Sequence, residues 1–324
     1  MGKREELLCL LGGTLRRAFE SAGINYETLE EIYIKTGQPV LLQMNGREWY
    51  LEKNGTLGIA SEMEKKIGLE AVLRPIPTDL TTIVEYACNY SIYAHTQEIR
   101  QGFLTVKGGH RIGVAGEVIL QDGKIMGMRT ISFLTIRVAH AVIGCSDRVL
   151  PYLVHQGKVY NTLILSPPGF GKTTLLRDCI RQISDGSSYC DGKKVAVVDE
   201  RSEIAACFQG VPQHSVGLRT IVLDGCPKDR GLMMLIRSMS PQVIAADEIG
   251  SEEEMNAIRY AMNCGCKLLC TMHAGCMEEV IQKPAIKELV EEQTFARFVF
   301  LRRQGRQHFY EIYNEKMIRC EKND

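Results

Sequence analysis

A glycine-containing loop that joins a short apolar segment to a predicted helix is the feature that most constrains the fold of this chain. Leu163–Leu165 indicate a buried strand, Ser166–Lys172 form the loop, and Thr173–Leu176 begin the helix. Such a loop points backbone N–H groups and the positive end of the helix dipole at one spot, which suits a phosphate group. The segment therefore predicts binding of a nucleoside triphosphate rather than a chance Gly/Pro turn.

Individual residues of this loop fit phosphate chemistry. Gly169 and Gly171 let the backbone close around phosphates. Lys172 is expected to reach the β- and γ-phosphate oxygens, and Thr173 to hold Mg²⁺. Ser166 stands where the usual pattern has its first glycine. The residues of this segment expected to contact ATP are Ser166, Pro167, Pro168, Gly169, Phe170, Gly171, Lys172, Thr173 and Thr174.

The composition limits what the chain can be. Its 324 residues are enough for two domains. Lys+Arg and Asp+Glu number 39 each, and a net charge of zero argues against a general nucleic-acid binder. No apolar run reaches the length of about 18 residues that crosses a bilayer. With no recognised export signal, the 12 cysteines are expected to be reduced thiols in the cytoplasm.

The chain changes character near residue 145. Residues 1–145 are expected to form a small α+β domain, with one helix over residues 5–22 and another from about residue 79 to residue 100. Asn45-Gly46 and Asp122-Gly123 predict hairpin turns. Residues 146–324 alternate strands and helices, which is typical of a mostly parallel sheet. The strands predicted there are Leu163–Leu165, Val195–Val198, Val243–Ala246 and Leu268–Thr271, followed by a hairpin of Phe298–Leu301 and Phe309–Ile312.

Two predicted strands of the second domain end in acids. Asp247 and Glu248 follow Val243–Ala246; in a P-loop protein such a carboxylate lies opposite the loop threonine. Asp247 is therefore the expected second Mg²⁺ ligand, and Glu248 the group that orients or deprotonates the attacking water. Asp199 and Glu200 end the earlier strand, and leave a second candidate for the catalytic base.

A histidine and several arginines complete the candidate site. His273 falls just past a strand end, where open α/β sheets place functional groups, although a structural role is the alternative. Arg219 lies in an irregular segment that is able to reach the γ-phosphate of a neighbouring subunit. Arg230 and Arg237 compete for that role, and each is otherwise an ordinary salt-bridge partner. Arg137 lies at the domain junction, from which it is expected to reach the nucleotide.

The order of these elements resembles the secretion-superfamily ATPases that drive type II and type IV secretion and type IV pili. They share a small N-terminal domain, a P-loop, an acidic "Asp box" strand, a Walker B strand and a histidine box. Over nearly the whole chain the sequence is similar to the stage III sporulation protein AA family of endospore-forming Firmicutes. The segments that carry this similarity are residues 108–116, 166–174, 198–204, 222–228 and 236–250.

The resemblance implies an α/β fold with a RecA-like P-loop NTPase core and a smaller N-terminal α+β domain. It implies a Mg²⁺-dependent ATPase that works as a homo-hexamer with ATP between subunits. The expected place is the mother-cell cytoplasm, at the membrane facing the forespore, where ATP turnover powers a secretion-like channel. A small membrane protein of the same complex would recruit the chain, which carries no anchor and is not expected to bind nucleic acid.

The resemblance also carries over single residues. Lys172 and Thr173 match the P-loop, Asp247-Glu248 the Walker B end, His273 the histidine box and Arg137 an arginine at the interdomain junction. Secretion-superfamily ATPases commonly have Gly-Glu at the Walker B end, whereas this chain has Asp247-Glu248. Their Asp box often reads Glu-Asp, whereas Asp199-Glu200 has the acids in the opposite order.

These departures leave the catalytic base open between Glu248 and the Asp199-Glu200 pair. Glu248 is favoured, because a glutamate beside a Mg²⁺-binding aspartate reaches the water without moving the metal. The residues expected to take part in catalysis are Glu248, Lys172, Glu200, Arg219 and His273. A RecA-like nucleic-acid-dependent ATPase and a small-molecule P-loop kinase are the alternative functions.

Overall fold

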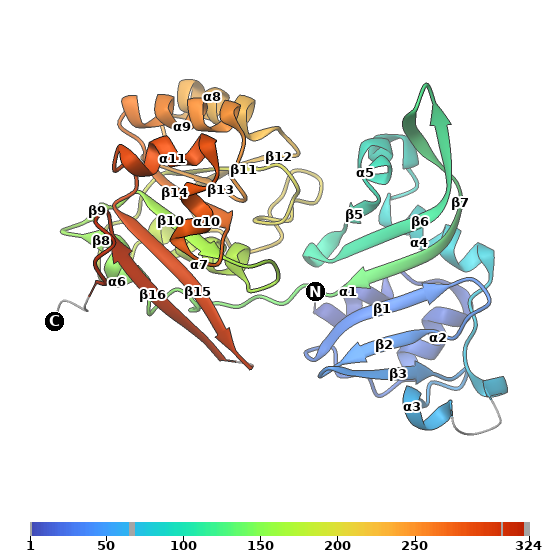
Figure 1. The fold of residues 1–324 in the computed structure, drawn as a ribbon. Helices are drawn as coiled ribbons and strands as arrows, with labels where there is room; N and C mark the ends of the chain where they lie inside the picture. Colours follow the sequence, from blue (N-terminus) through green and yellow to red (C-terminus); the bar gives the residue numbers. More distant parts are fainter. Residues whose placement is uncertain (1, 65–68, 306, 321–324) are drawn as a thin grey trace. The chain divides into compact units, whose positions relative to one another are not determined.

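The structure is a computed structural model that describes residues 2–64, 69–305 and 307–320. The chain divides into two compact units, Met1–His140 and Ala141–Asp324, whereas the sequence placed the boundary after residue 145. Each unit has its own seven-stranded sheet and its own core, so each is described by itself (Figure 1).

The first unit is built on an antiparallel sheet whose strands follow the order β4-β3-β2-β1-β7-β6-β5. Its strands are β1 (Leu29–Lys35), β2 (Leu41–Met44), β3 (Arg47–Leu51), β4 (Leu57–Ile59), β5 (Phe103–Thr105), β6 (Arg111–Gln121) and β7 (Lys124–Arg137). Both predicted hairpin turns are confirmed. Asn45 and Asp122 have φ values of 53° and 51°, and the glycines that follow them are left-handed as well, as a tight two-residue hairpin requires.

The helices of the first unit correct two predictions. They are α1 (Lys3–Leu8), α2 (Gly13–Ser21), α3 (Ala60–Met63), α4 (Pro77–Ala87) and α5 (Thr96–Arg100), with 3₁₀ turns η1 (Leu69–Ala71), η2 (Ile92–His95) and η3 (Lys107–Gly109). The single helix predicted over residues 5–22 is wrong, because residues 9–12 separate α1 from α2 and Gly13, at the start of α2, has a φ of 53°. The helix predicted to run to residue 100 ends at Ala87, because Asn89 and Tyr90 are left-handed.

His110 is a buried anchor for the end of the first unit. Its side chain is fully buried, and its Nδ1 accepts a hydrogen bond from the Ala139 N–H at 3.0 Å. Nε2 lies 3.3 Å from the Glu6 carboxylate. Burial, together with the nearby charges of His140 and Lys3, lowers the pKa of His110 to about 4. The residue is therefore neutral in the folded protein near pH 7.

Stability of the folded chain is expected to fall in acid because of His110. An unfolded histidine takes up a proton near pH 6.5, whereas folded His110 resists protonation down to about pH 4, so stability is lost as the pH falls between these values. The free energy of unfolding, measured with urea, should decrease between pH 7 and pH 4.5. In His110→Asn this decrease should be about 2–3 kcal/mol smaller than in the wild type. His308→Asn, at an exposed histidine, should lose as much as the wild type. Equal losses in all three proteins would contradict this role of His110.

The second unit is an α/β unit with a mainly parallel sheet, as the sequence predicted. Its order is β12-β11-β13-β14-β10-β15-β16, and only the β15–β16 pair is antiparallel among the described neighbours. These strands are β10 (Thr162–Ser166), β11 (Val195–Asp199), β12 (Thr220–Asp224), β13 (Val243–Ala246), β14 (Lys267–His273), β15 (Arg297–Gln304) and β16 (Gln307–Asn314), beside a small β8–β9 pair (Val154–His155, Lys158–Val159). The edge strand β12 is not among the strands that the sequence predicts.

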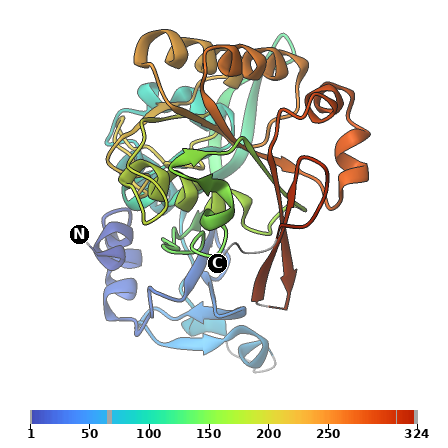
Figure 2. The same cartoon turned by 90° about the vertical axis from the view of Figure 1, so that its left-hand side faces the viewer.

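Helices cover both faces of this sheet (Figure 2). They are α6 (Leu150–Leu153), α7 (Lys172–Asp185), α8 (Lys228–Met239), α9 (Glu252–Asn263), α10 (Met277–Ile281) and α11 (Pro284–Glu291). Apolar side chains of α7 form one core with the sheet, and those of α8, α9 and α11 form the other. No described helix combines the length and apolar character needed to cross a membrane.

The parallel register brings distant parts of the sequence to one edge of the sheet. Ser166 at the end of β10 pairs with His273 at the end of β14, and Val198 in β11 pairs with Ala246 at the end of β13. The residues that directly follow these strands therefore meet at the carboxyl edge, where open α/β sheets bind their ligands.

Candidate active site

The loop between β10 and α7 has the backbone of a phosphate cradle. Gly169 and Gly171 have φ values of 76° and 93°, and a Cβ at either position would meet no atom within 4 Å. Glycine is needed there for its backbone conformation and not for space. Ser166, by contrast, belongs to β10, is 1% exposed and donates its hydroxyl to the Pro167 carbonyl at 2.8 Å. A strand residue needs no left-handed backbone, which explains how serine replaces the usual first glycine.

Three predicted site residues form a connected chain at the sheet edge. The Lys172 Nζ lies 2.9 Å from His273 Nδ1, and His273 Nε2 lies 2.6 Å from Glu248 Oε1. A charged lysine only donates, so Nδ1 accepts and the proton on Nε2 points at the Glu248 carboxylate. Lys172 is 5% exposed, and this burial lowers its pKa.

Thr173 and Asp247, the two predicted Mg²⁺ ligands, are also in contact. The Thr173 hydroxyl donates to Asp247 Oδ2 at 2.5 Å. Thr271 of β14 donates its hydroxyl to Asp247 Oδ1 and accepts a hydrogen bond from the Glu248 N–H at 2.9 Å. A hydroxyl and a carboxylate side by side are oxygen donors of the kind that Mg²⁺ prefers when phosphates and water complete its shell.

No group of three His, Cys, Asp or Glu side chains that would hold a metal ion is found in the described part of the chain. The cysteines that lie close together in the sequence, Cys264, Cys266, Cys270 and Cys276, form no such group there. Cys270 is instead a buried residue of β14, and burial raises the pKa of its thiol to about 12.

Asp199, one of the alternative bases, accepts hydrogen bonds from backbone N–H groups. It is 2% exposed and accepts hydrogen bonds from the N–H groups of Glu203, Ile204 and Ala205 at 2.8, 3.0 and 2.8 Å. Burial raises the pKa of Asp199 despite these bonds. From α7, Arg177 donates to the Ile204 and Glu203 carbonyls at 2.5 and 2.6 Å. Together these two side chains hold the loop after β11 in place.

Glu200, the other alternative base, forms an ion pair with a lysine. Lys228 at the start of α8 lies 2.8 Å from Glu200 Oε2 and 3.1 Å from Glu254 Oε1. Hydrogen bonds and attraction to these two acids raise the pKa of Lys228 against the opposing effect of burial. Of the acids considered as base, Glu248 is the one bonded to a partner of the P-loop lysine, and this geometry supports its assignment.

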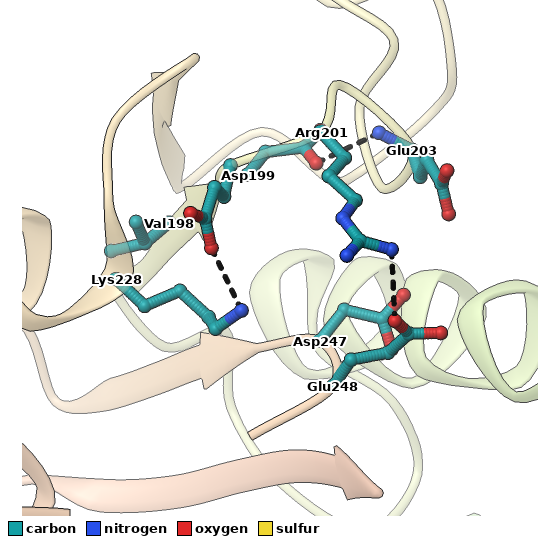
Figure 3. Close-up of a pocket in the computed structure, with 8 residues that line it drawn as sticks. Val198, Asp199, Arg201, Glu203, Lys228, Asp247 and Glu248 are labelled. Atoms are coloured by element: carbon teal, nitrogen blue, oxygen red, sulfur yellow. Dashed lines mark hydrogen bonds and ion pairs between the residues drawn. The ribbon is translucent and has the colours of Figure 1, made fainter. Parts of the chain in front are cut away.

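Arg201 also reaches this site, and sequence reasoning did not single it out. It follows the Asp199-Glu200 pair, and its Nη1 lies 3.2 Å from Glu248 Oε2. Figure 3 shows its guanidinium directed toward Asp247 and Glu248 across a pocket that is lined by residues 198–201, 203, 228, 247 and 248. The sequence feature that could have pointed to Arg201 is its position two residues after Asp199, at the acidic end of a predicted strand.

Arg219 lies elsewhere within its own chain. Its Nη1 donates to the carbonyls of Ser184 and Asp185 at 3.1 and 3.3 Å, at the C-terminal end of α7. The phosphate loop is at the other end of that helix, roughly 20 Å away at the usual helical rise. The structure therefore does not bring Arg219 into the site of its own subunit; its role across subunits stays a prediction.

Within the second unit, the described contacts of Arg230 and Arg237 do not include the P-loop. Arg230 and Arg237 lie on α8, where Arg237 stacks over the Tyr260 ring with 5.9 Å to the centroid. Arg137 belongs to the first unit and pairs with Glu31 at 2.9 Å. Its contact with nucleotide stays a prediction.

Comparison with known proteins places the whole chain in context. The family model described as "Sporulation stage III, protein AA" matches residues 1–320. The chain is 40% identical over 275 residues to "Stage III sporulation protein AA" of Bacillus subtilis (strain 168), covering 85% of this chain and 83% of that protein.

Solved structures share the fold. The Legionella pneumophila ATPase DotB matches with a TM-score of 0.55 at 15% identity, over 93% of this chain and 79% of that chain. The pilus retraction motor PilT with bound ADP matches with a TM-score of 0.56 at 16% identity, over 89% of this chain and 80% of that chain. At these identities the likeness shows the fold, and the predicted P-loop core with a smaller N-terminal unit is confirmed.

Proposed function

Because the chain belongs to the sporulation stage III protein AA family, we propose that it is an ATPase that drives a secretion-like channel during endospore formation. The observation that carries the proposal is the contact of the Thr173 hydroxyl with Asp247 at 2.5 Å, beside the phosphate loop and next to Glu248. This is the pairing by which P-loop ATPases hold Mg²⁺ opposite the phosphates.

Binding begins with an exchange of partners at Lys172. The N–H groups of the loop and the α7 dipole receive the phosphates, and Lys172 leaves His273 for the β- and γ-phosphate oxygens. Thr173 and Asp247 are the ligands for Mg²⁺, and the ion when bound neutralises charge on these phosphates. The partly desolvated lysine strengthens the attraction, because the low local dielectric screens it less.

Glu248 then serves as the base. Its carboxylate orients a water molecule in line with the γ-phosphorus and takes a proton as the water oxygen forms the new P–O bond. The bond from the γ-phosphorus to the β–γ bridging oxygen breaks, and ADP leaves with that electron pair. His273, which links Glu248 to Lys172, holds the carboxylate in position before the nucleotide arrives.

The finer proposal concerns assembly. We propose a homo-hexamer with ATP between subunits, in which an arginine from the neighbour approaches the γ-phosphate and the first unit moves against the second. Its place is the mother-cell cytoplasm, at the membrane facing the forespore, where a small membrane protein of the channel complex recruits it. Membership of the family and the fold shared with DotB and PilT support this arrangement.

The purified full chain tests the function through phosphate release from ATP. We expect steady hydrolysis in Mg²⁺ and its loss when EDTA removes the ion, because Thr173 and Asp247 are the proposed oxygen ligands of an ion that offsets the charge of the phosphates. Added DNA or RNA should leave the rate unchanged, in keeping with a net charge of zero. Stimulation by nucleic acid with a steep salt dependence would favour the alternative of a nucleic-acid-dependent ATPase. Transfer of phosphate to an added acceptor instead of water would favour a kinase.

A further inference from the structure

Arg201 forms an ion pair whose partner is the proposed catalytic base. The contact joins Arg201 Nη1 to Glu248 Oε2 at 3.2 Å, with 66% of the arginine side chain and 29% of the glutamate side chain exposed (Figure 3). The other oxygen of Glu248 is bonded to His273. Each carboxylate oxygen of Glu248 thus contacts one side chain of the protein, and the Oε2 contact is with an exposed arginine.

The other cations around this pocket have fixed structural partners. Lys228 is 10% exposed and bridges two carboxylates, Glu200 and Glu254. Arg177 is bonded to two backbone carbonyls of the loop after β11, and burial lowers its pKa. Among the cations described near Asp247, Arg201 therefore has the greatest freedom to exchange its partner for a phosphate.

We propose that Arg201 binds the γ-phosphate of ATP within its own subunit and releases Glu248 when it does so. This inference rests on the proposed function. A γ-phosphate offers a guanidinium more negative charge than one carboxylate does, and several oxygens for paired hydrogen bonds. ADP lacks this group, so in the ADP complex Arg201 stays on Glu248.

The proposal explains how the site distinguishes its two nucleotides. Lys172, His273, Glu248 and Arg201 form one continuous chain of contacts. Any phosphate bound at the loop separates Lys172 from His273. Only a γ-phosphate separates Arg201 from Glu248. Glu248 Oε2 is then released from Arg201 to orient water only when ATP occupies the site, while Oε1 stays bonded to His273.

Nucleotide affinity tests the assignment without requiring turnover. The full chain is titrated with ADP and with a non-hydrolysable ATP analogue in Mg²⁺. Arg201→Ala should bind the analogue roughly tenfold to a hundredfold more weakly than the wild type, as loss of a charged hydrogen-bonding group implies. Its affinity for ADP should stay within about twofold. Arg201→Lys should recover part of the loss, since lysine keeps the charge without the paired geometry.

Arg129→Ala is the matched control. Arg129 is 70% exposed and pairs with Glu117 at 3.3 Å in the first unit, so it repeats the exposure and the contact of Arg201 away from the pocket. The Arg129→Ala variant should bind ADP and the ATP analogue as tightly as the wild type does. An equal loss for ADP and the analogue in Arg201→Ala, or no loss for either, would overturn the role of Arg201 alone. A wild-type chain that binds neither nucleotide would overturn the proposed function together with it.

Discussion

Replacing Glu248 with glutamine is expected to lower kcat for ATP hydrolysis by about 10²–10⁴-fold, the usual contribution of a general base. Glutamine keeps the size of the side chain but takes up no proton. The amide oxygen is still able to accept from His273 or from Arg201, whereas the NH2 group accepts from neither. Because the loop and Lys172 are the proposed phosphate ligands, the affinity for ATP should change little. The variant should therefore hold ATP without hydrolysing it. Single-turnover phosphate release, compared with binding of a non-hydrolysable analogue, separates the two effects.

The same experiment decides between the two acidic strand ends. Glu200→Gln should lose far less activity, because Glu200 is paired with Lys228 and not with a partner of the P-loop lysine. Glu253→Gln, at an exposed position in the first turn of α9, controls for loss of a negative charge. If Glu200→Gln lost more activity than Glu248→Gln, the base would belong to the loop after β11.

Replacing Lys172 with alanine is expected to abolish nucleotide binding as well as hydrolysis. The lysine is the charged side chain aimed at the phosphates, and removal of such a group from a partly desolvated site costs about 10²–10³-fold in rate even where binding survives. Phosphate release and analogue binding should both fall to background. Thermal unfolding should change little, because burial already disfavours the lysine charge in the folded state.

Two outcomes of the Lys172 variant are informative about the loop. Lys267→Ala, at an exposed lysine at the opposite end of the same sheet, should keep wild-type activity. Wild-type turnover in Lys172→Ala would mean that the loop between β10 and α7 is not the phosphate site. A large loss of thermal stability would mean that its ammonium group also holds the fold together.

The sequence was sufficient to predict that four candidate residues meet at one edge of the sheet, because parallel strands of one sheet end at the same edge. Lys172, Asp247, Glu248 and His273 all lie just past or at the end of predicted strands, or in the loop after one. Parallel strands end at the same edge, so residues about 100 positions apart meet without further information. The juxtaposition follows from the order of strands and turns alone.

The sequence could not predict which groups each side chain contacts in the folded structure. Arg201 and Arg219 look alike in the sequence, yet one faces Glu248 and the other holds the end of α7. Asp199 resembles a catalytic acid, although three backbone N–H groups take up its oxygens. The helix breaks at Gly13 and Asn89 were missed because an apolar repeat continues across each left-handed residue.

The contacts of the Thr271 hydroxyl limit which mutations this site tolerates. The hydroxyl contacts the Asp247 carboxylate and the Glu248 N–H, while His273 of the same strand contacts Lys172 and Glu248. One strand thus contacts the proposed metal ligand, the proposed base and the lysine proposed to bind phosphate. Mutations that shift β14 cannot adjust one of these groups while sparing the others. Slower or faster versions of this site should therefore arise through the surrounding loops, while β14 itself tolerates few alterations.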